Sequence, residues 1–133
     1  MLAGVVVKPN EISGIIVDAA MKVHSALGPG LLESAYEACL RHELSKRGLK
    51  CECQLALPVI YDGESIDLGY RIALMVANAV IVELKAITAL APIHDAQIIS
   101  YLRLSGKPIG LLINFHVLHL KDGIRRFVNN LNP

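Results

Sequence analysis

Glu83 and Lys85 are one residue apart in an otherwise apolar segment, Val80–Ala86. In a β-strand, side chains two positions apart project from the same face, so this carboxylate and ammonium would share one side while Val82 and Leu84 point to the other. A carboxylate can hold a divalent metal ion against a phosphate, and a neighbouring lysine can steady the developing negative charge. The pair indicates a hydrolytic site for phosphate esters, with the solvated face of an ordinary strand as the alternative.

A second β-rich run, Ile66–Val76, precedes this strand, and the short connection Ala77–Ala79 predicts an antiparallel hairpin. If the connection holds three residues, position 73 lies opposite Glu83 and the two side chains emerge side by side. Mg²⁺ requires converging oxygen ligands, usually with one or two carboxylates among them. A carboxylate at position 73 would complete such a site, but this chain has alanine there.

Three polar side chains of a predicted helix could meet a phosphate backbone. Pro92 suits the first turn of this helix, which ends before Gly106. His94, Gln97 and Tyr101 follow one another at spacings of four or three residues, so they line one face. The same spacing is also that of the polar side of an ordinary amphipathic helix.

Glu33 is a further candidate, because it lies in the first turn of a predicted helix, Leu31–Arg47. A carboxylate at this place interacts favourably with the helix dipole whatever its function, so helix capping is the alternative explanation. An earlier helix is predicted from a cap at Asn10 to Leu27, where Gly28-Pro29-Gly30 stops it.

The remaining segments complete one domain. We predict a strand at Lys50–Leu57, a tight turn at Asp62-Gly63, a buried strand at Ile109–Phe115, and a final amphipathic piece at Ile124–Val128 that is helix or strand. The element order is then α, α, β, β, β, α, β. Residues 1–133 are expected to form a single mixed α/β domain, since the length fits one core and no linker appears.

Composition limits the classes of partner. Hydrophobic residues make up 53% of the chain and charged residues 19%, which favours self-association, most simply as a homodimer. Thirteen Lys and Arg face twelve Asp and Glu, for a net charge of +1. The strong basic field of dedicated nucleic-acid-binding proteins is therefore absent, and any phosphate contact must be local.

Cysteine usage and hydropathy predict a cytoplasmic, soluble protein with no membrane partner. The three cysteines form no paired framework and lack the second ligand pair of a zinc site, so we expect reduced thiols: Cys39, Cys51 and Cys53. The apolar stretch Val5–Val7 is too short for an export signal, and the run Ile72–Val82 is interrupted and too short to span a bilayer.

The segment Gly30–Glu37, which reads GLLESAYE, resembles the signature for which the bacterial GxxExxY proteins are named. The resemblance covers about residues 12–130, and further stretches carry it: His24–Gly30, Lys46–Leu49, Val82–Ala86, His94–Gln97, Gly110–Phe115 and Lys121–Ile124. It implies a PD-(D/E)xK nuclease fold, which is a restriction-endonuclease-like αβββαβ core, here with an extra N-terminal helix. It also implies Mg²⁺- or Mn²⁺-dependent cleavage of phosphodiester bonds in nucleic acid. We favour DNA over RNA as the partner, and the sequence leaves the choice between them open.

The resemblance carries five candidate catalytic residues over to this chain: Glu33, Glu83, Lys85, Gln97 and Tyr101. Glu33 matches the acidic residue of the first core helix, and Glu83 with Lys85 matches the Glu-x-Lys motif. Gln97 and Tyr101 resemble the Gln-x-x-x-Tyr helix of related exonucleases. The metal ligands would be Glu83, Glu33 and an aspartate at position 73, where the family pattern Arg-Ile-Asp-Leu reads Arg-Ile-Ala-Leu in this chain.

Replacement of that aspartate by Ala73 is expected to weaken metal binding severely, because the remaining charge offsets too little of the dehydration cost. The first hypothesis is therefore a nuclease with impaired cleavage. One alternative is a binding module without turnover, whose phosphate contacts would be Arg103, Lys107, Arg125 and Arg126. Another is an interaction subunit whose apolar surface pairs with itself or with another protein.

Overall fold

A computed structural model describes residues 7–129 of the chain, so Val7 is the only described residue of the apolar stretch Val5–Val7. The described part contains three α-helices: α1 (Pro9–Leu27), α2 (Glu33–Lys46) and α3 (Pro92–Ser105). Its strands are β1 (Cys51–Ala56), β2 (Val59–Tyr61), β3 (Glu64–Ile66), β4 (Arg71–Val76), β5 (Val80–Lys85), β6 (Ile109–Asn114) and β7 (Ile124–Val128), and a 3₁₀-helix, η1 (Leu120–Gly123), precedes the last of them.

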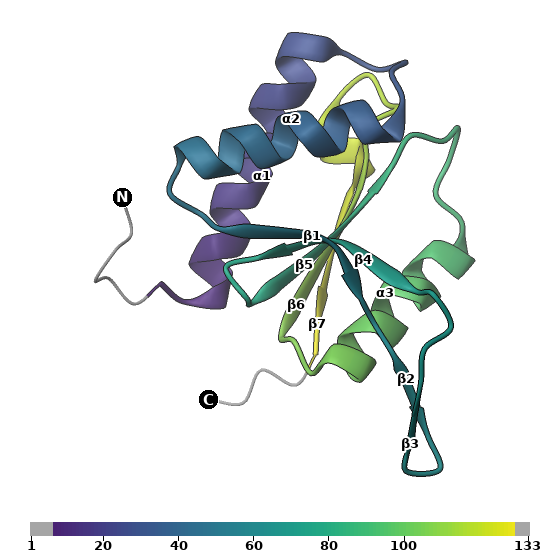
Figure 1. Cartoon of the computed structure of the whole chain (residues 1–133). Coiled ribbons are helices and arrows are strands. Elements are labelled where there is room, and N and C mark those ends of the chain that lie inside the picture. The colour runs from purple at the N-terminus through teal and green to yellow at the C-terminus, as the bar shows by residue number, and fades with distance from the viewer. Residues whose placement is uncertain (1–6, 130–133) are drawn as a thin grey trace.

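The central sheet has five strands in the order β1-β4-β5-β6-β7. Strands β5 and β6 are parallel and the other neighbours are antiparallel. Helices α1 and α2 cover one face of the sheet and α3 covers the other (Figure 1). This three-layer mixed α/β arrangement confirms the predicted restriction-endonuclease-like fold class.

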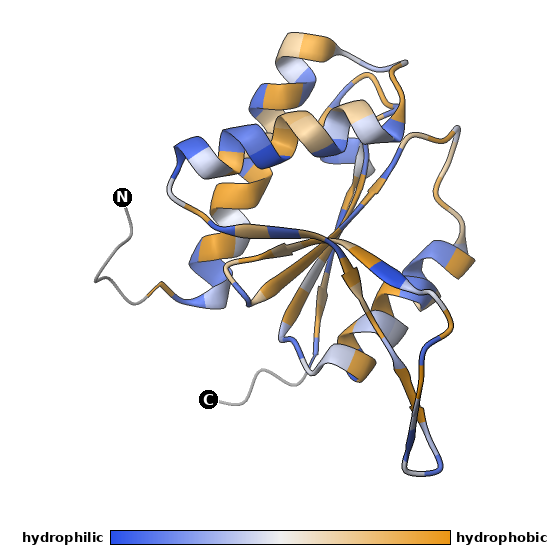
Figure 2. Ribbon diagram, in the orientation of Figure 1, coloured by the Kyte–Doolittle hydropathy of each residue, from blue (hydrophilic) through white to orange (hydrophobic). Residues whose placement is uncertain are grey.

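The larger core lies between the sheet and the α1/α2 layer. Its helix contribution comes from apolar residues at helical spacing, among them Ile12, Ile16 and Val23, and Figure 2 shows hydrophobic residues along the strands beneath. Strands β5 and β6 are covered on both faces, which explains why their sequences are nearly continuous apolar runs. Each fully buried aliphatic side chain here stabilises the fold by roughly 1.5–3 kcal/mol.

The smaller core lies under α3 and depends on a close approach of helix to strand. Ile98 and Leu102 of α3 are buried against β6. A Cβ atom at Gly110 would lie 2.9 Å from Cδ1 of Ile98, so glycine at this position lets the helix sit directly on the strand.

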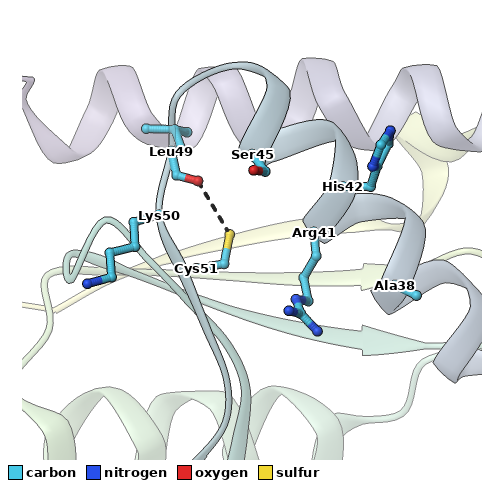
Figure 3. Close-up of a pocket in the computed structure, with 7 residues that line it drawn as sticks. All are labelled: Ala38, Arg41, His42, Ser45, Leu49, Lys50 and Cys51. Carbon is cyan, nitrogen blue, oxygen red and sulfur yellow. Dashed lines mark hydrogen bonds between the residues drawn. The ribbon is translucent and has the colours of Figure 1, made fainter. Parts of the chain in front are cut away.

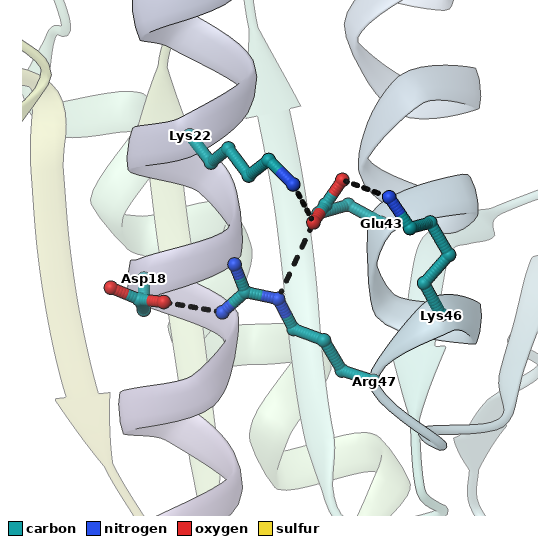
Figure 4. A network of polar contacts seen from close by, with 5 residues as sticks. All are labelled: Asp18, Lys22, Glu43, Lys46 and Arg47. Carbon is teal, nitrogen blue, oxygen red and sulfur yellow. Dashed lines mark hydrogen bonds and ion pairs between the residues drawn. The ribbon is translucent and has the colours of Figure 1, made fainter.

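A charged network fixes α2 against α1 (Figure 4). The Glu43 carboxylate accepts a hydrogen bond from Lys22 Nζ at 3.0 Å and lies 3.6 Å from Arg47 Nε, while Arg47 also pairs with Asp18. The hydrogen bond from Lys22 is the main reason that the pKa of Glu43 is lowered, and it outweighs desolvation of the carboxylate. The network sets the position of α2, which begins with Glu33.

Two helix boundaries differ from the sequence prediction. Helix α1 begins at Pro9 with Lys8 as its N-cap, so Asn10 is inside the helix and does not cap it. Helix α2 begins at Glu33, because Leu32 has an extended backbone (ψ 148) and serves as the N-cap. Helix α3, Pro92–Ser105, begins and ends where it was predicted.

The predicted strand Ile66–Val76 is wrong as one element. Strand β3 ends at Ile66 and β4 begins at Arg71, and Gly69 between them has a left-handed backbone (φ 81) that interrupts the extended chain. The turn at Asp62-Gly63 is confirmed, but it closes an additional two-stranded ribbon, β2–β3. The final piece, Ile124–Val128, is a strand and not a helix.

No helix within residues 7–129 combines the length and apolar character needed to span a bilayer. The three cysteines are free thiols.

Candidate active site

The candidate site lies where β4 and β5 part. The ladder between them consists of Val76 with Val80, Met75 with Ile81, and Leu74 with Val82. Before Leu74, β4 pairs with β1 alone, and after Val82, β5 pairs with β6 alone. The strands therefore form a fork (Figure 1). Glu83 and Lys85 lie on its β5 arm.

A local break in the outer ladder frees one backbone amide in the fork. Strand β1 pairs with β4 on both sides of Gln54, but Gln54 itself has a left-handed backbone (φ 50) and forms no ladder pair with Ala73. The Ala73 amide instead donates to Oε1 of Glu83 at 3.3 Å. The predicted three-residue connection, Ala77–Ala79, is confirmed and brings position 73 next to Glu83, although the two residues do not form the expected ladder pair.

Glu83 is a buried carboxyl group with 7% of its surface exposed. Burial raises its pKa to about 7, against the opposing effects of the Ala73 amide and the Lys85 ammonium. The charges of Glu33 and Glu37 raise this pKa further. At neutral pH the group therefore exists in both protonation states, as a general acid or base requires.

Helix α2 brings two carboxylates to the fork. Burial raises the pKa of Glu33, Lys85 lowers it, and Glu37 raises it, so these groups share one electrostatic environment with Glu83. Glu37 lies one helical turn after Glu33, and its carboxylate accepts a hydrogen bond from the Gln54 side chain at 3.0 Å. The sequence prediction did not include Glu37 among the candidate site residues, although its i,i+4 spacing from Glu33 indicated that the two side chains share one face of the helix.

Tyr36 fixes the connection that leads into α2. It is fully buried and stacks on Phe115, with ring centroids 4.5 Å apart. Its hydroxyl donates to the Gly28 carbonyl at 2.5 Å and accepts from the Leu31 amide at 3.1 Å. These bonds tie both ends of the loop together, which fixes where Glu33 enters the site.

Lys85 is held by the end of β6. It pairs with Asn114, and its carbonyl accepts the Phe115 amide at 2.9 Å. The buried Asn114 side chain accepts from the Ile87 amide at 3.1 Å and donates to the Ile87 carbonyl at 3.0 Å. The backbone on both sides of the site lysine is thereby fixed.

The polar face of α3 is only partly available to the fork. Gln97 Nε2 donates to the Tyr101 hydroxyl at 3.1 Å, as their spacing predicted, but Tyr101 is 6% exposed and belongs to the smaller core. In the described part of the chain neither side chain forms a hydrogen bond or an ion pair with Glu83 or Lys85. His94 accepts the Ala91 amide through Nδ1 at 2.8 Å and so caps α3.

The donor set does not fit a divalent metal ion. Across residues 7–129, no group of three or more His, Cys, Asp or Glu side chains is placed to hold one. Position 73 contributes a methyl group, and one oxygen of Glu83 already accepts a backbone hydrogen bond. A site for Mg²⁺ needs more converging oxygen ligands than the fork provides.

A model of the PD-(D/E)XK nuclease superfamily matches residues 10–127 of the chain. The chain belongs to this superfamily. The match runs from the first turn of α1 into β7, so it includes the fork, and it supports a nuclease-like function on nucleic acid. PD-(D/E)XK nucleases typically depend on a divalent metal ion. No curated protein and no solved structure matches the chain significantly.

Proposed function

We propose that this PD-(D/E)XK protein acts on phosphodiester bonds of nucleic acid at the β4/β5 fork, and that alanine at position 73 impairs its cleavage. One observation carries the proposal: the Ala73 amide is 3.3 Å from the Glu83 carboxylate. A side chain at position 73 would therefore begin beside that carboxylate. An aspartate there would supply the oxygen ligands that the fork lacks.

The chain's own residues have distinct roles in this proposal. Glu83, with a pKa of about 7, can take up or release a proton at neutral pH. Lys85 lies two positions further along the same strand and supplies a positive charge for a phosphate oxygen. Glu33 adds negative charge from α2, and Gln97 would orient the substrate from α3, where its side chain is held by the buried Tyr101 hydroxyl.

The experiment compares the natural chain with Ala73→Asp and with Ala73→Asn, a control of nearly equal shape without the charge. Isothermal titration with Mg²⁺ and Mn²⁺ should detect binding in the aspartate variant and little in the other two. Cleavage of labelled DNA and RNA oligonucleotides should follow the same order, with DNA preferred. Equal behaviour of the Asp and Asn variants, or no cleavage by either, would contradict a metal-dependent nuclease site.

A second candidate function is nucleic-acid binding without turnover. It is favoured by Ala73, which contributes no oxygen ligand beside Glu83, and by the absence, within residues 7–129, of three His, Cys, Asp or Glu side chains placed to hold a metal ion. Of the four cations predicted as phosphate contacts for such a module, three have internal partners: Arg125 pairs with Asp95, Arg126 with Asn10 and Lys107 with Asn78. A binding surface would therefore have to lie elsewhere on the molecule.

We also propose that the chain is a GxxExxY protein, since each named position of that signature has a structural task. Gly30 has a left-handed backbone (φ 105), Glu33 reaches the fork, and Tyr36 bonds the loop between them.

We further propose that the protein forms a homodimer, which is supported by exposed apolar side chains such as Leu32 (77%) and Leu118 (82%). A cytoplasmic location is supported by the three free thiols. Size-exclusion chromatography with light scattering tests the dimer.

A further inference from the structure

Helix α2 and the edge strand β1 lie side by side along a line that starts at the fork. Near the fork, Glu37 of α2 is bonded to Gln54 of β1. Two helical turns after Glu33, Arg41 lies close enough to Cys53 to act on its pKa, which burial raises and the arginine lowers. At ~1.5 Å of rise per residue, Arg41 is roughly 12 Å from Glu33 along the helix axis.

This line ends in an open pocket of about 460 Å³ between the C-terminal half of α2 and the start of β1 (Figure 3). Its polar lining consists of Arg41, His42, Ser45 and Lys50 around Cys51, and no Asp or Glu lines it. Figure 3 shows Arg41 and Lys50 on opposite sides of Cys51. Both of these cationic residues are exposed.

The two cations of the pocket differ from most others in the described part of the chain. Lys22, Lys46 and Arg47 surround Glu43, and Arg125 is paired with Asp95. Arg41 and Lys50 form no ion pair and no side-chain hydrogen bond within residues 7–129. In a chain of net charge +1, two uncompensated cations in one hollow favour an anionic ligand.

We propose that the groove between α2 and β1 binds the sugar-phosphate backbone of a nucleic acid, with Arg41 and Lys50 as its phosphate contacts. The proposal rests on the proposed function, because the same strand would continue to the β4/β5 fork. Each strand of B-form DNA carries one phosphate per ~3.4 Å of duplex axis, so a duplex aligned with α2 would place about three or four phosphates of one strand within the roughly 12 Å between Glu33 and Arg41. The lining contains no Phe, Tyr or Trp ring, and its one aromatic group is the His42 imidazole. Because the two cations contact phosphates, the contact is mainly to the backbone and is independent of sequence.

One side chain in the groove, Glu37, disfavours a nucleic-acid strand there. Its carboxylate lies between the fork and the pocket and would repel a passing phosphate. Removal of that charge by Glu37→Gln should therefore tighten nucleic-acid binding.

The test measures binding without cleavage. Fluorescence anisotropy with a labelled DNA duplex is recorded in EDTA at several salt concentrations for the natural chain, for Arg41→Gln/Lys50→Gln, and for Arg103→Gln/Lys107→Gln. Both double variants remove two positive charges, and the second removes them from the α3 side of the molecule. The groove variant should bind at least about tenfold more weakly at 0.1 M salt, with a salt slope reduced by about 1.8. The α3 variant should bind like the natural chain.

Three results would overturn the proposal: equal weakening in both double variants, no measurable binding by the natural chain, or full competition by millimolar inorganic phosphate. Thermal melting checks that both variants are folded, and Glu37→Gln should bind about threefold more tightly, as loss of one repulsive charge predicts. Because the assay contains no metal, its outcome is independent of whether Ala73→Asp gains cleavage. The groove and the catalytic proposal can therefore fail separately.

Discussion

Glu83 accepts the backbone hydrogen bond of Ala73, a residue on the neighbouring strand that does not pair with it in the sheet ladder. The bond exists because Gln54 leaves the ladder and the amide opposite it has no strand partner. A single amide does not offset the burial of a carboxylate, whose pKa stays near 7. The ionised Glu83 carboxylate therefore lowers the stability of the folded protein at alkaline pH.

Glu83→Gln should stabilise the protein at high pH and leave it unchanged at low pH. Because the folded-state pKa, about 7, lies above the ordinary 4.5, folding favours the protonated group. Its stabilising contribution is complete below pH 4.5 and is lost as the pH rises to 7. The variant should exceed the natural chain by about 3 kcal/mol in unfolding free energy at pH 8. Urea denaturation from pH 4 to 8 measures it, and a difference independent of pH would refute the buried-acid interpretation.

Ala73→Asp should make folding depend on metal. Without metal at pH 8, a second carboxylate beside Glu83 should lower the unfolding free energy by about 1–3 kcal/mol relative to Ala73→Asn. If the ion binds with a Kd of about 1 mM, 10 mM Mg²⁺ should raise the unfolding free energy of the aspartate variant by roughly 1.4 kcal/mol and its Tm by about 5 °C. Differential scanning fluorimetry with and without Mg²⁺ tests this. The Asn variant should not respond, and a similar rise in both would indicate an ionic-strength effect.

Tyr36→Phe should loosen the connection that positions Glu33. The substitution keeps the ring that stacks on Phe115 but leaves the Gly28 carbonyl and the Leu31 amide without their partner. The expected loss is about 1–3 kcal/mol in unfolding free energy.

Tyr61→Phe is the matched control for this change, since the Tyr61 side chain is 71% exposed. Chemical denaturation of both variants measures the difference. A loss of equal size in the two would show that the buried hydroxyl does not hold the loop.

Gly123→Ala and Gly14→Ala should have opposite effects. A Cβ atom at Gly123 would lie 2.2 Å from the Asn114 carbonyl oxygen, so the strand that holds Lys85 would have to shift, at a cost of about 2–4 kcal/mol. At Gly14, within α1, nothing lies within 4 Å of the added atom, and alanine should stabilise the helix by about 0.5–1 kcal/mol. Thermal unfolding of the pair tests both signs, and an unaffected Gly123→Ala would exclude the close contact.

Local patterns were sufficient to predict the elements that carry the site. Helix α3 follows from Pro92 and Gly106, and the β4–β5 hairpin from β-rich runs on either side of a three-residue connection. Val82 and Leu84 lie together in the larger core, as their alternation with Glu83 predicted, because a two-residue period needs no tertiary information. These features depend on neighbours in the chain, which the sequence displays directly.

The fork itself could not be predicted. It depends on the backbone of Gln54, a residue whose type gives little sign of a left-handed conformation, and on β1 lying beside β4. Tyr101 was predicted to face the substrate, but its ring packs in the smaller core. Helical spacing shows which residues share a face of a helix, but it does not show which of them other parts of the protein cover. In both cases the deciding contact comes from a segment distant in sequence.

The β2–β3 ribbon has one more consequence. None of its six residues is buried, so neither core depends on it. Its amide protons should exchange with solvent by local opening, long before the central sheet unfolds. The turn at Asp62-Gly63 is therefore the natural insertion point for a fluorophore or affinity tag, which would report on the protein without touching the site at the fork.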